Sequence, residues 1–313
     1  WLMFLTVRMD IRLSKQKIEW HAQLPKVAEQ TMPAAAAELA LPGRWRRPLQ
    51  GGWRSDTQCA KTGGVPMTRH VICMKWGTKY GPHYVNNLYA MARRHLQGDF
   101  RFICLTDNTE GIRAEVECFP IPRLDIRPEA AGVRDMAWRK LTTFSTDLVD
   151  VYGLHGTALF LDLDVVVVGS LDDFFAKPGE FLIIKDYKRP WRVTGNSSVY
   201  RFEIGAHPDV LDYFRANEDK MRRDFRNEQA YLSDYLHRQG MLQYWPAEWC
   251  PSFKYHCIPF WPSNYWREPL IPDGTRIVIF HGECNPPDAL TGKRKRRFRH
   301  IEPTLWVAEH WKE

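Results

Sequence analysis

One apolar run limits what this chain can fold into more than any other feature of its sequence. Residues 157–168 read Thr-Ala-Leu-Phe-Leu-Asp-Leu-Asp-Val-Val-Val-Val, which is apolar almost throughout and rich in valine. Such runs are typical of a strand that is covered on both faces, as in a parallel sheet flanked by helices. The run is far shorter than the roughly 20 residues that a membrane-spanning helix needs. We therefore expect residues 157–168 to form the central strand of an α/β sheet.

Segments on both sides of this run alternate between strand and helix patterns. Apolar side chains recur at helical spacing in four segments, at 84–96, 135–152, 208–221 and 226–239. Shorter apolar segments predict strands, at 70–76, 100–105, 116–119, 181–184 and 276–280. This alternation predicts an α/β fold: a Rossmann-like, open and mostly parallel sheet with helices on both faces. Ligands of such sheets bind at the carboxyl ends of the strands.

The two ends of the chain differ from this α/β body. Residues 1–66 carry ten Lys or Arg and five Asp or Glu, and they have neither helical nor strand periodicity. We interpret them as a poorly ordered or non-native extension, so that the natural domain starts near Met67. We expect the domain to span residues 67–290. A basic tail, 291–313, follows and contains the run Lys293-Arg-Lys-Arg-Arg-Phe-Arg299.

The distribution of charge and the cysteines indicate which partners the protein binds and in which compartment it occurs. The net charge is +7, but acidic residues outnumber basic ones once residues 1–66 and the run 293–299 are set aside. This balance argues against extended contact with nucleic acid. The run itself fits anionic lipid headgroups, which predicts peripheral contact with the inner membrane, although a solvated tail is the alternative. The seven cysteines form no C-x-x-C pair, which is typical of a reduced cytoplasmic protein.

Two aspartates interrupt the apolar run, and they predict a metal site. Asp162 and Asp164 are two residues apart, so in a strand their side chains leave the same face. Buried carboxylates need a compensating cation, and hard oxygen ligands suit Mn²⁺ or Mg²⁺. The alternative is that the strand ends here and both carboxylates are solvated. His281 reaches the same edge if strand 276–280 neighbours the central strand, and Gly282 lets a phosphate approach the backbone.

Four segments of the chain resemble a known enzyme family. Segment 159–174, with the D-x-D pair, resembles that of GT-A glycosyltransferases, most closely the bacterial family 8 type. Gly195-Asn-Ser-Ser-Val-Tyr-Arg-Phe202 is similar to the family's F-N-A/S-G strand. Asn227-Glu-Gln-Ala-Tyr-Leu232 is similar to its D-Q-D-x-L helix start, and Phe280-His-Gly282 to its H-F-x-G segment. The likeness covers about residues 69–290. It implies a GT-A-like fold and a nucleotide-diphosphate sugar, such as a UDP-sugar, as the donor.

The resemblance also implies roles for the matching residues. Asp162, Asp164 and His281 would bind the metal together with the donor diphosphate. Asn196 and Gln229 would contact the donor sugar or the reaction centre. Glu228 stands where the family has an aspartate.

Further candidates come from residue type and position. Trp76, Lys79 and Tyr80 follow the first strand and offer aromatic rings for a base and a lysine for ribose or phosphate, although the rings could instead cap the core. Lys140 is a candidate phosphate clamp, with a solvated surface lysine as the alternative. For the proton of an acceptor hydroxyl, the candidate carboxylates include Glu228 and Asp186.

These features together predict metal-dependent transfer of a sugar to a hydroxyl acceptor such as a glycan or a glycolipid. Trp261 and Tyr265, in an aromatic-rich segment, are candidates for the acceptor site, whereas a loop-rich satellite core is the alternative. A nucleotidyltransferase of related fold is a second possibility, but Gly77-Thr-Lys-Tyr-Gly81 is a poor version of its glycine-rich loop. A third is a non-catalytic protein that binds nucleotide or nucleic acid.

Overall fold

A computed structural model of the chain describes residues 68–125, 135–282, 284–294 and 300–313. The chain divides into two units, and all of these residues belong to the second, Gly52–Glu313. The extension expected at 1–66 and residues 295–299 of the basic run lie outside the described residues. Within the described residues, no helix has both the length and the apolar character needed to cross a membrane.

Seven strands form the main sheet: β1 (Arg69–Lys75), β2 (Arg101–Thr106), β3 (Glu117–Phe119), β4 (Thr157–Leu161), β6 (Phe181–Lys185), β7 (Gly195–Glu203) and β8 (Leu242–Tyr244). Their order is β3-β2-β1-β4-β7-β6-β8. Neighbours from β3 to β4 pair in parallel, as do β6 and β8, whereas β7 is antiparallel to β4 and β6. The prediction of an open, mostly parallel α/β sheet is confirmed.

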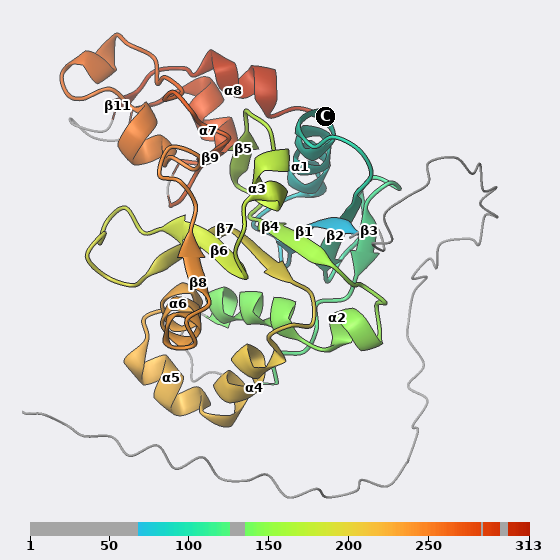
Figure 1. The fold of residues 1–313 in the computed structure, drawn as a ribbon. Helices are drawn as coiled ribbons and strands as arrows, with labels where there is room; N and C mark the ends of the chain where they lie inside the picture. Colours follow the sequence, from blue (N-terminus) through green and yellow to red (C-terminus); the bar gives the residue numbers. More distant parts are fainter. Residues whose placement is uncertain (1–67, 126–134, 283, 295–299) are drawn as a thin grey trace, which may run out of the picture. The chain divides into compact units, whose positions relative to one another are not determined.

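Helices cover both faces of this sheet, with α1 above it and α4 to α6 below it in Figure 1. They are α1 (Pro82–His95), the 3-10 helix η1 (Asp135–Phe144), α2 (Asp147–Asp150), α3 (Asp172–Ala176), α4 (Pro208–Ala216), α5 (Glu218–Asp224) and α6 (Glu228–Arg238). Alternate residues of β1 enter two separate cores. Val71 and Cys73 pack in the core that contains the buried side chains of α1, and Ile72 and Met74 in the core of η1, α4 and α6. Burial on both faces is what the apolar patterns predict.

The central apolar run is not one strand, so that prediction was wrong. β4 ends at Leu161, residues 162–164 turn, and β5 (Val165–Val167) joins a second, two-stranded sheet. There β5 pairs antiparallel with β9 (Ile277–Ile279), so β9 neighbours β5 and not β4. Every residue of β4 and β5 is buried. Hydrophobicity alone therefore could not reveal that the chain passes from one sheet to the other.

Two predicted helices are each divided. Residues 135–152 form η1 and then α2, where the hydroxyl of Ser145 accepts the N–H of Asp147 (3.2 Å) and so begins a new helix. Residues 208–221 belong to α4 and α5, which Asn217 separates. Apolar side chains at helical spacing continue across both breaks, which is why the pattern indicated single helices.

The C-terminal segment returns to the core. It contains α7 (Pro286–Thr291), β10 (Lys293–Arg294), β11 (His300–Ile301) and α8 (Leu305–His310). Trp306, Val307 and Trp311 are buried, and the ring of Trp311 lies 5.2 Å from that of Tyr84 in α1. Figure 1 shows the C-terminus beside α1. The described residues of the segment expected as a basic tail are thus packed on the domain. Between β8 and β9 lie the single-turn π-helix η2 (Phe253–Cys257) and the 3-10 turn η3 (Ser263–Tyr265).

A buried histidine in β1 makes the stability depend on pH. His70 is fully buried, and burial together with the charge of Arg101 lowers its pKa to about 4. At a pH between about 4 and 6.5, His70 is protonated in the unfolded chain but remains neutral in the folded chain. Stability that is present above this pH is therefore lost as the pH falls toward about 4, by up to about 3 kcal/mol.

We expect His70→Leu to lose less stability between about pH 7.5 and about pH 5 than the wild type loses. The measurement is the free energy of unfolding in urea at both pH values. His237→Leu, at an exposed position of α6, is the matched control. An equal loss in wild type and His70→Leu would contradict this role of His70.

Candidate active site

The two aspartates lie at the carboxyl end of β4, where the order of the parallel strands reverses. In the sheet, β2 lies next to β1 on one side, and β4, which comes later in the chain, lies next to β1 on the other side. The turn after β1 carries Tyr80, and the turn after β4 carries Asp162 and Asp164. Crevices at such switch points bind the ligands of open α/β sheets.

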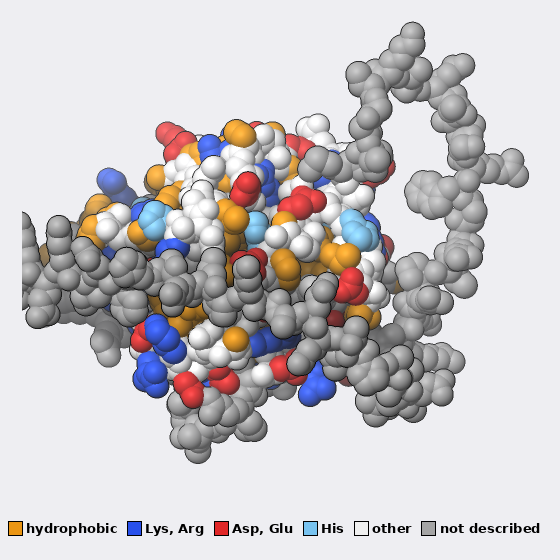
Figure 2. All heavy atoms as spheres, turned by 60° about the horizontal axis from the view of Figure 1, so that its bottom comes forward, with side chains coloured by type: hydrophobic (Ala, Val, Ile, Leu, Met, Phe, Trp, Pro, Cys, Tyr) orange, Lys and Arg blue, Asp and Glu red, His pale blue; other side chains and the backbone are white. Residues whose placement is uncertain are grey.

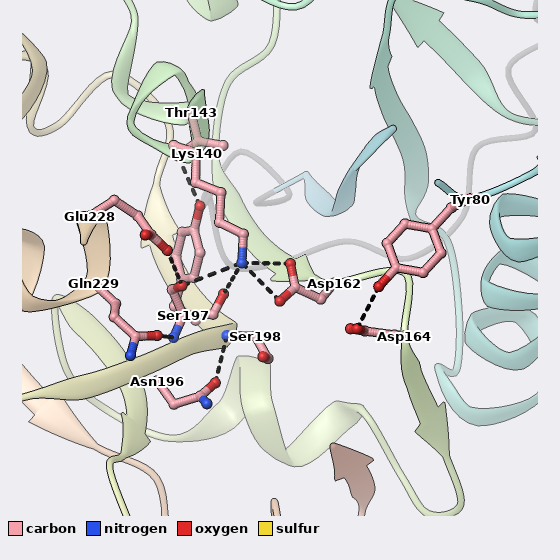
Figure 3. Close-up of polar contacts among 11 residues, drawn as sticks. Tyr80, Lys140, Thr143, Asp162, Asp164, Asn196, Ser197, Ser198, Glu228 and Gln229 are labelled. Carbon is pink, nitrogen blue, oxygen red and sulfur yellow. Dashed lines mark hydrogen bonds and ion pairs between the residues drawn. The ribbon is translucent and has the colours of Figure 1, made fainter. Parts of the chain in front are cut away.

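Each aspartate has a partner from a different element, as Figure 3 shows. The ammonium group of Lys140 lies 2.7 Å from Oδ1 and 2.8 Å from Oδ2 of Asp162. The hydroxyl of Tyr80 donates to Oδ2 of Asp164 (2.7 Å). Both carboxylates occupy the space between Lys140 and Tyr80. The structure thus brings the predicted pair together with two predicted nucleotide-binding residues.

Threonine hydroxyls fix the helix that carries Lys140. Thr142 and Thr143 donate to the carbonyls of Arg139 and Lys140, three residues back, each at 2.8 Å. The hydroxyl of Thr143 also lies 2.9 Å from that of Tyr200 in β7. η1 is thereby tied to the sheet beside the lysine, and the side chain of Lys140 is held against the end of β4.

A third carboxylate completes the charged group. Ser197 in β7 receives two hydrogen bonds from Lys140, at its carbonyl (3.4 Å) and its hydroxyl (3.3 Å). The same hydroxyl donates to Oε1 of Glu228 (2.8 Å), which is buried in the first turn of α6. Asn227 caps this helix by accepting the N–H of Ala230 (3.3 Å), which sets where Glu228 stands.

The pKa values of the group reveal an excess of negative charge. Burial first, and the charge of Asp162 second, raise the pKa of Asp164 to about 6, against the opposing effects of Tyr80 and Lys140. Burial also raises the pKa of Glu228. Burial alone would lower the pKa of Lys140, but the carboxylates of Asp162 and Glu228 outweigh it and raise the pKa. Three carboxylates lie around Lys140, and the charge of Lys79 also acts on Asp164, so the group carries one more negative than positive charge when all are ionised.

The two predicted amide residues lie beside Glu228. Oδ1 of Asn196 accepts the N–H of Ser198 (2.9 Å), and Oε1 of Gln229 accepts that of Ser197 (3.3 Å). Ser197 was not among the predicted site residues, although it links Lys140 to Glu228. The only sequence signal for it was its position directly after Asn196 in the segment Gly195–Phe202.

His281 does not join the aspartates. The N–H of Phe280 donates to the carbonyl of Asp164 (3.1 Å), but the His281 ring turns to the hydroxyl of Ser252, 2.8 Å from its Nε2. Its ring stacks near Tyr187, at 6.2 Å between centroids. Across the described ranges, no three His, Cys, Asp or Glu side chains are grouped so as to hold a metal ion. β9 pairs with β5 rather than with β4, so His281 does not end a strand beside β4 as the sequence had predicted.

Other predicted residues lie around these two groups. Asp186 follows β6 and acts electrostatically on His281 rather than on the aspartates. Gly282 has a left-handed backbone, with φ of 88°. The ammonium group of Lys79 lies 4.4 Å from the centre of the Tyr80 ring. Trp76 is half-buried, and its indole N–H is buried without a hydrogen-bond partner among the described residues.

Trp261 and Tyr265 lie in and beside η3. Their side chains are exposed, and the ring of Tyr265 stacks on that of His300 at 4.8 Å between centroids. Neither side chain is therefore part of a buried satellite core, and a role for them at the acceptor site stays a prediction.

Three cavities lie away from this group. The first, about 600 Å³, is bordered by Thr157 at the amino end of β4 and by Arg201, whose guanidinium donates to the carbonyls of Phe174 and Phe175 at the end of α3. The others, of about 490 and 290 Å³, border α4, α5 and α6. None of these three contains a pair of adjacent carboxylates at a carboxyl edge, so we place the candidate site at the aspartates.

Two solved structures of the galactosyltransferase LgtC match this fold. The first, LgtC in complex with donor and acceptor sugar analogues, has a TM-score of 0.46 and 12% sequence identity, and the match covers 69% of this chain and 88% of that chain. The second, an active-site mutant of LgtC, has a TM-score of 0.47 and 12% identity, with 69% and 89% covered. No protein-family model matches the chain, and no curated protein matches its sequence.

Proposed function

We propose that the chain is a metal-dependent glycosyltransferase that moves a sugar from a nucleotide-diphosphate sugar, such as a UDP-sugar, to a hydroxyl group of a glycan or glycolipid. The observation that carries the proposal is the charged group at the switch point between β1 and β4. There Asp162 and Asp164 lie beside the half-buried Lys140 and the buried Glu228. Excess carboxylate charge at the ligand-binding edge is what a cation shared with a diphosphate would neutralise.

Asp162 and Asp164 are the residues that would hold the cation. They fit it by chemistry, because both offer carboxylate oxygens and the pKa of Asp164 is raised to about 6. Lys140 forms an ion pair with Asp162 in this structure, so binding of the cation requires this ion pair to break or lengthen. When bound, Mn²⁺ or Mg²⁺ stabilises the leaving diphosphate as a Lewis acid. His281 is oriented toward Ser252 and remains a proposed ligand only if its ring rotates.

The chain's own residues supply the other functions. Lys140, released from Asp162, can donate to a diphosphate or sugar oxygen. Asn196 and Gln229 lie beside Glu228, where they can position the donor sugar. Trp76 offers a buried indole N–H, and Lys79 and Tyr80 flank the acid pair from the turn after β1. Glu228 is oriented by Ser197 and accepts the proton of the acceptor hydroxyl.

The test is a screen of nucleotide sugars with Mn²⁺ or Mg²⁺, with nucleoside triphosphates plus sugar phosphates as a second set. We expect metal-dependent release of a nucleoside diphosphate from one or more nucleotide sugars. Release of pyrophosphate from the second set, with no turnover of the first, would instead identify a nucleotidyltransferase.

Glu228→Gln is expected to lower transfer to the acceptor by about 100-fold or more, because a carboxamide cannot take a proton. The amide oxygen can still accept from Ser197, so we expect donor affinity to stay within about threefold. The measurement is kcat for transfer and the KM of the donor, with Glu309→Gln on α8 as the exposed control. Full turnover by Glu228→Gln would remove this residue from the mechanism.

The proposed partners follow from the remaining surface. Acidic and basic side chains both occur on the face drawn in Figure 2. That nucleic acid is not a partner stays a prediction from the charge balance of the sequence. The basic run at 293–299 still supports the proposal of a peripheral contact with an anionic membrane, where a glycolipid acceptor would be found. We also keep the cytoplasmic location as a proposal.

A further inference from the structure

Basic and aromatic side chains form a second group beside the aspartates. It consists of Lys188, Lys254, Tyr255, His256 and His281. The ammonium groups of Lys188 and Lys254 lie 5.6 and 5.5 Å from the centre of the Tyr255 ring. The His281 ring lies 5.5 Å from the same ring. Two cations from different segments thus converge on one tyrosine.

These two lysines have no carboxylate partner for their ammonium groups among the described residues. Among the described residues, no Asp or Glu forms a salt bridge with Lys188 or Lys254. In contrast, Lys140 pairs with Asp162 and Lys220 with Asp224. The carboxylate of Asp186 accepts the backbone N–H of Lys188 (3.0 Å) rather than its ammonium group. Two ammonium groups near a single carboxylate, that of Asp186, leave a net positive charge, which an anion would neutralise.

Neutral donors complete the group. Nδ1 of His256 accepts the N–H of Ser252 (2.9 Å), so in the neutral ring Nε2 carries the hydrogen and can donate. The Tyr187 ring lies 5.2 Å from the His256 ring, and its hydroxyl is buried without a hydrogen-bond partner among the described residues. Lysine ammonium, imidazole N–H and tyrosine O–H are all donors that suit the oxygens of a phosphate.

The group adjoins the candidate active site. Phe280 bonds to the backbone of Asp164, and His281 is the next residue. β6 runs in the same direction as β4, because β7 is antiparallel to both. The segment after β6, with Tyr187 and Lys188, therefore leaves the sheet at the same edge as the aspartates.

We propose that Lys188, Lys254, His256 and Tyr187 form a binding site for a phosphate group. The phosphate would come from the diphosphate of the donor or from a phosphate carried by the acceptor. Only this choice of source rests on the proposed function. Binding of a phosphate itself requires no turnover.

The test is titration calorimetry with inorganic pyrophosphate. We expect the wild type to bind it, and the double variant Lys188→Ala/Lys254→Ala to bind it at least about tenfold more weakly. Lys188→Arg/Lys254→Arg should retain most of the affinity, and Lys220→Ala on α5 is the control for loss of an ordinary surface charge. Circular dichroism establishes that each variant is folded. No binding by the wild type, or equal binding by the alanine variant, would overturn the proposal.

Competition identifies the source of the phosphate. If it is the donor, UDP displaces pyrophosphate, and the alanine variant loses affinity for UDP as well. If it is the acceptor, pyrophosphate still binds in saturating UDP, and the affinity for UDP is unchanged. Both results are obtained without a sugar donor, so failure of the glycosyltransferase proposal in the nucleotide-sugar screen would leave them intact.

Discussion

Asp164→Asn is expected to lower nucleotide-sugar turnover by about 100- to 1,000-fold, the usual effect of removing one preorganised electrostatic contact to the reacting charge. The variant keeps the shape of the side chain, and its amide oxygen can still accept from the hydroxyl of Tyr80. It removes the negative charge with which Asp162 would share a cation. The measurement is the rate of nucleoside-diphosphate release over a range of Mn²⁺ concentrations.

The same variant should be at least as stable as the wild type. The folded state raises the pKa of Asp164 to about 6, above its ordinary value of 3.8. Stability is therefore present below the ordinary value and is lost as the pH rises through about 6. Asn removes this loss, so the midpoint of thermal unfolding at neutral pH should not fall. A variant that is inactive because it is unfolded, or one that is fully active, would contradict the role of Asp164.

Lys140→Met is expected to destabilise the protein by about 1–3 kcal/mol without metal, because it leaves the buried Glu228 and the half-buried Asp162 and Asp164 without their cation. The affected groups are Asp162, Asp164 and Glu228, all of which influence the pKa of Lys140. Mn²⁺ should then restore much of the stability, since it binds the folded state and no lysine competes for Asp162. The measurement is urea unfolding with and without MnCl₂.

The control for this prediction keeps the charge. Lys140→Arg should be less destabilised than Lys140→Met and should gain less stability from Mn²⁺. Lys220→Met, on the exposed face of α5, should respond to Mn²⁺ as the wild type does. If Mn²⁺ stabilises Lys140→Met no more than the wild type, Asp162 does not hold a cation.

Local patterns predicted the outline of the fold well. β1, β2 and α1 lie within two residues of the segments expected from apolar spacing, because each buries side chains on a regular period. The break after Leu161 was not predictable in this way, since β4 and β5 are equally apolar and only long-range pairing assigns them to different sheets. The separation of α4 from α5 at Asn217 was missed for a similar reason.

The sequence predicted which residues belong to the candidate site, but not which of them contact one another. Asp162, Asp164 and Lys140 were all expected there, yet nothing in the sequence indicates that the lysine pairs with the first aspartate. Tyr80 was expected to stack on a base, and the hydrogen bond from its hydroxyl to Asp164 was not predicted. Such contacts join residues 22 and 84 positions apart in the chain, which no local spacing encodes.

The turn at 162–164 joins two sheets, so Asp162 is anchored through its N–H to β7, whereas the carbonyl of Asp164 is bonded to Phe280 beside β9. The gap between the two carboxylates is consequently not a fixed strand repeat. It depends on how the smaller sheet is seated against its surroundings, for example where the N–H of Val167 meets the sulfur of Met91 in α1. Substitutions where β5 meets α1 would therefore be expected to change the separation of the two carboxylates, and with it the size of cation that they could bind under the proposed function, while leaving both aspartates in place.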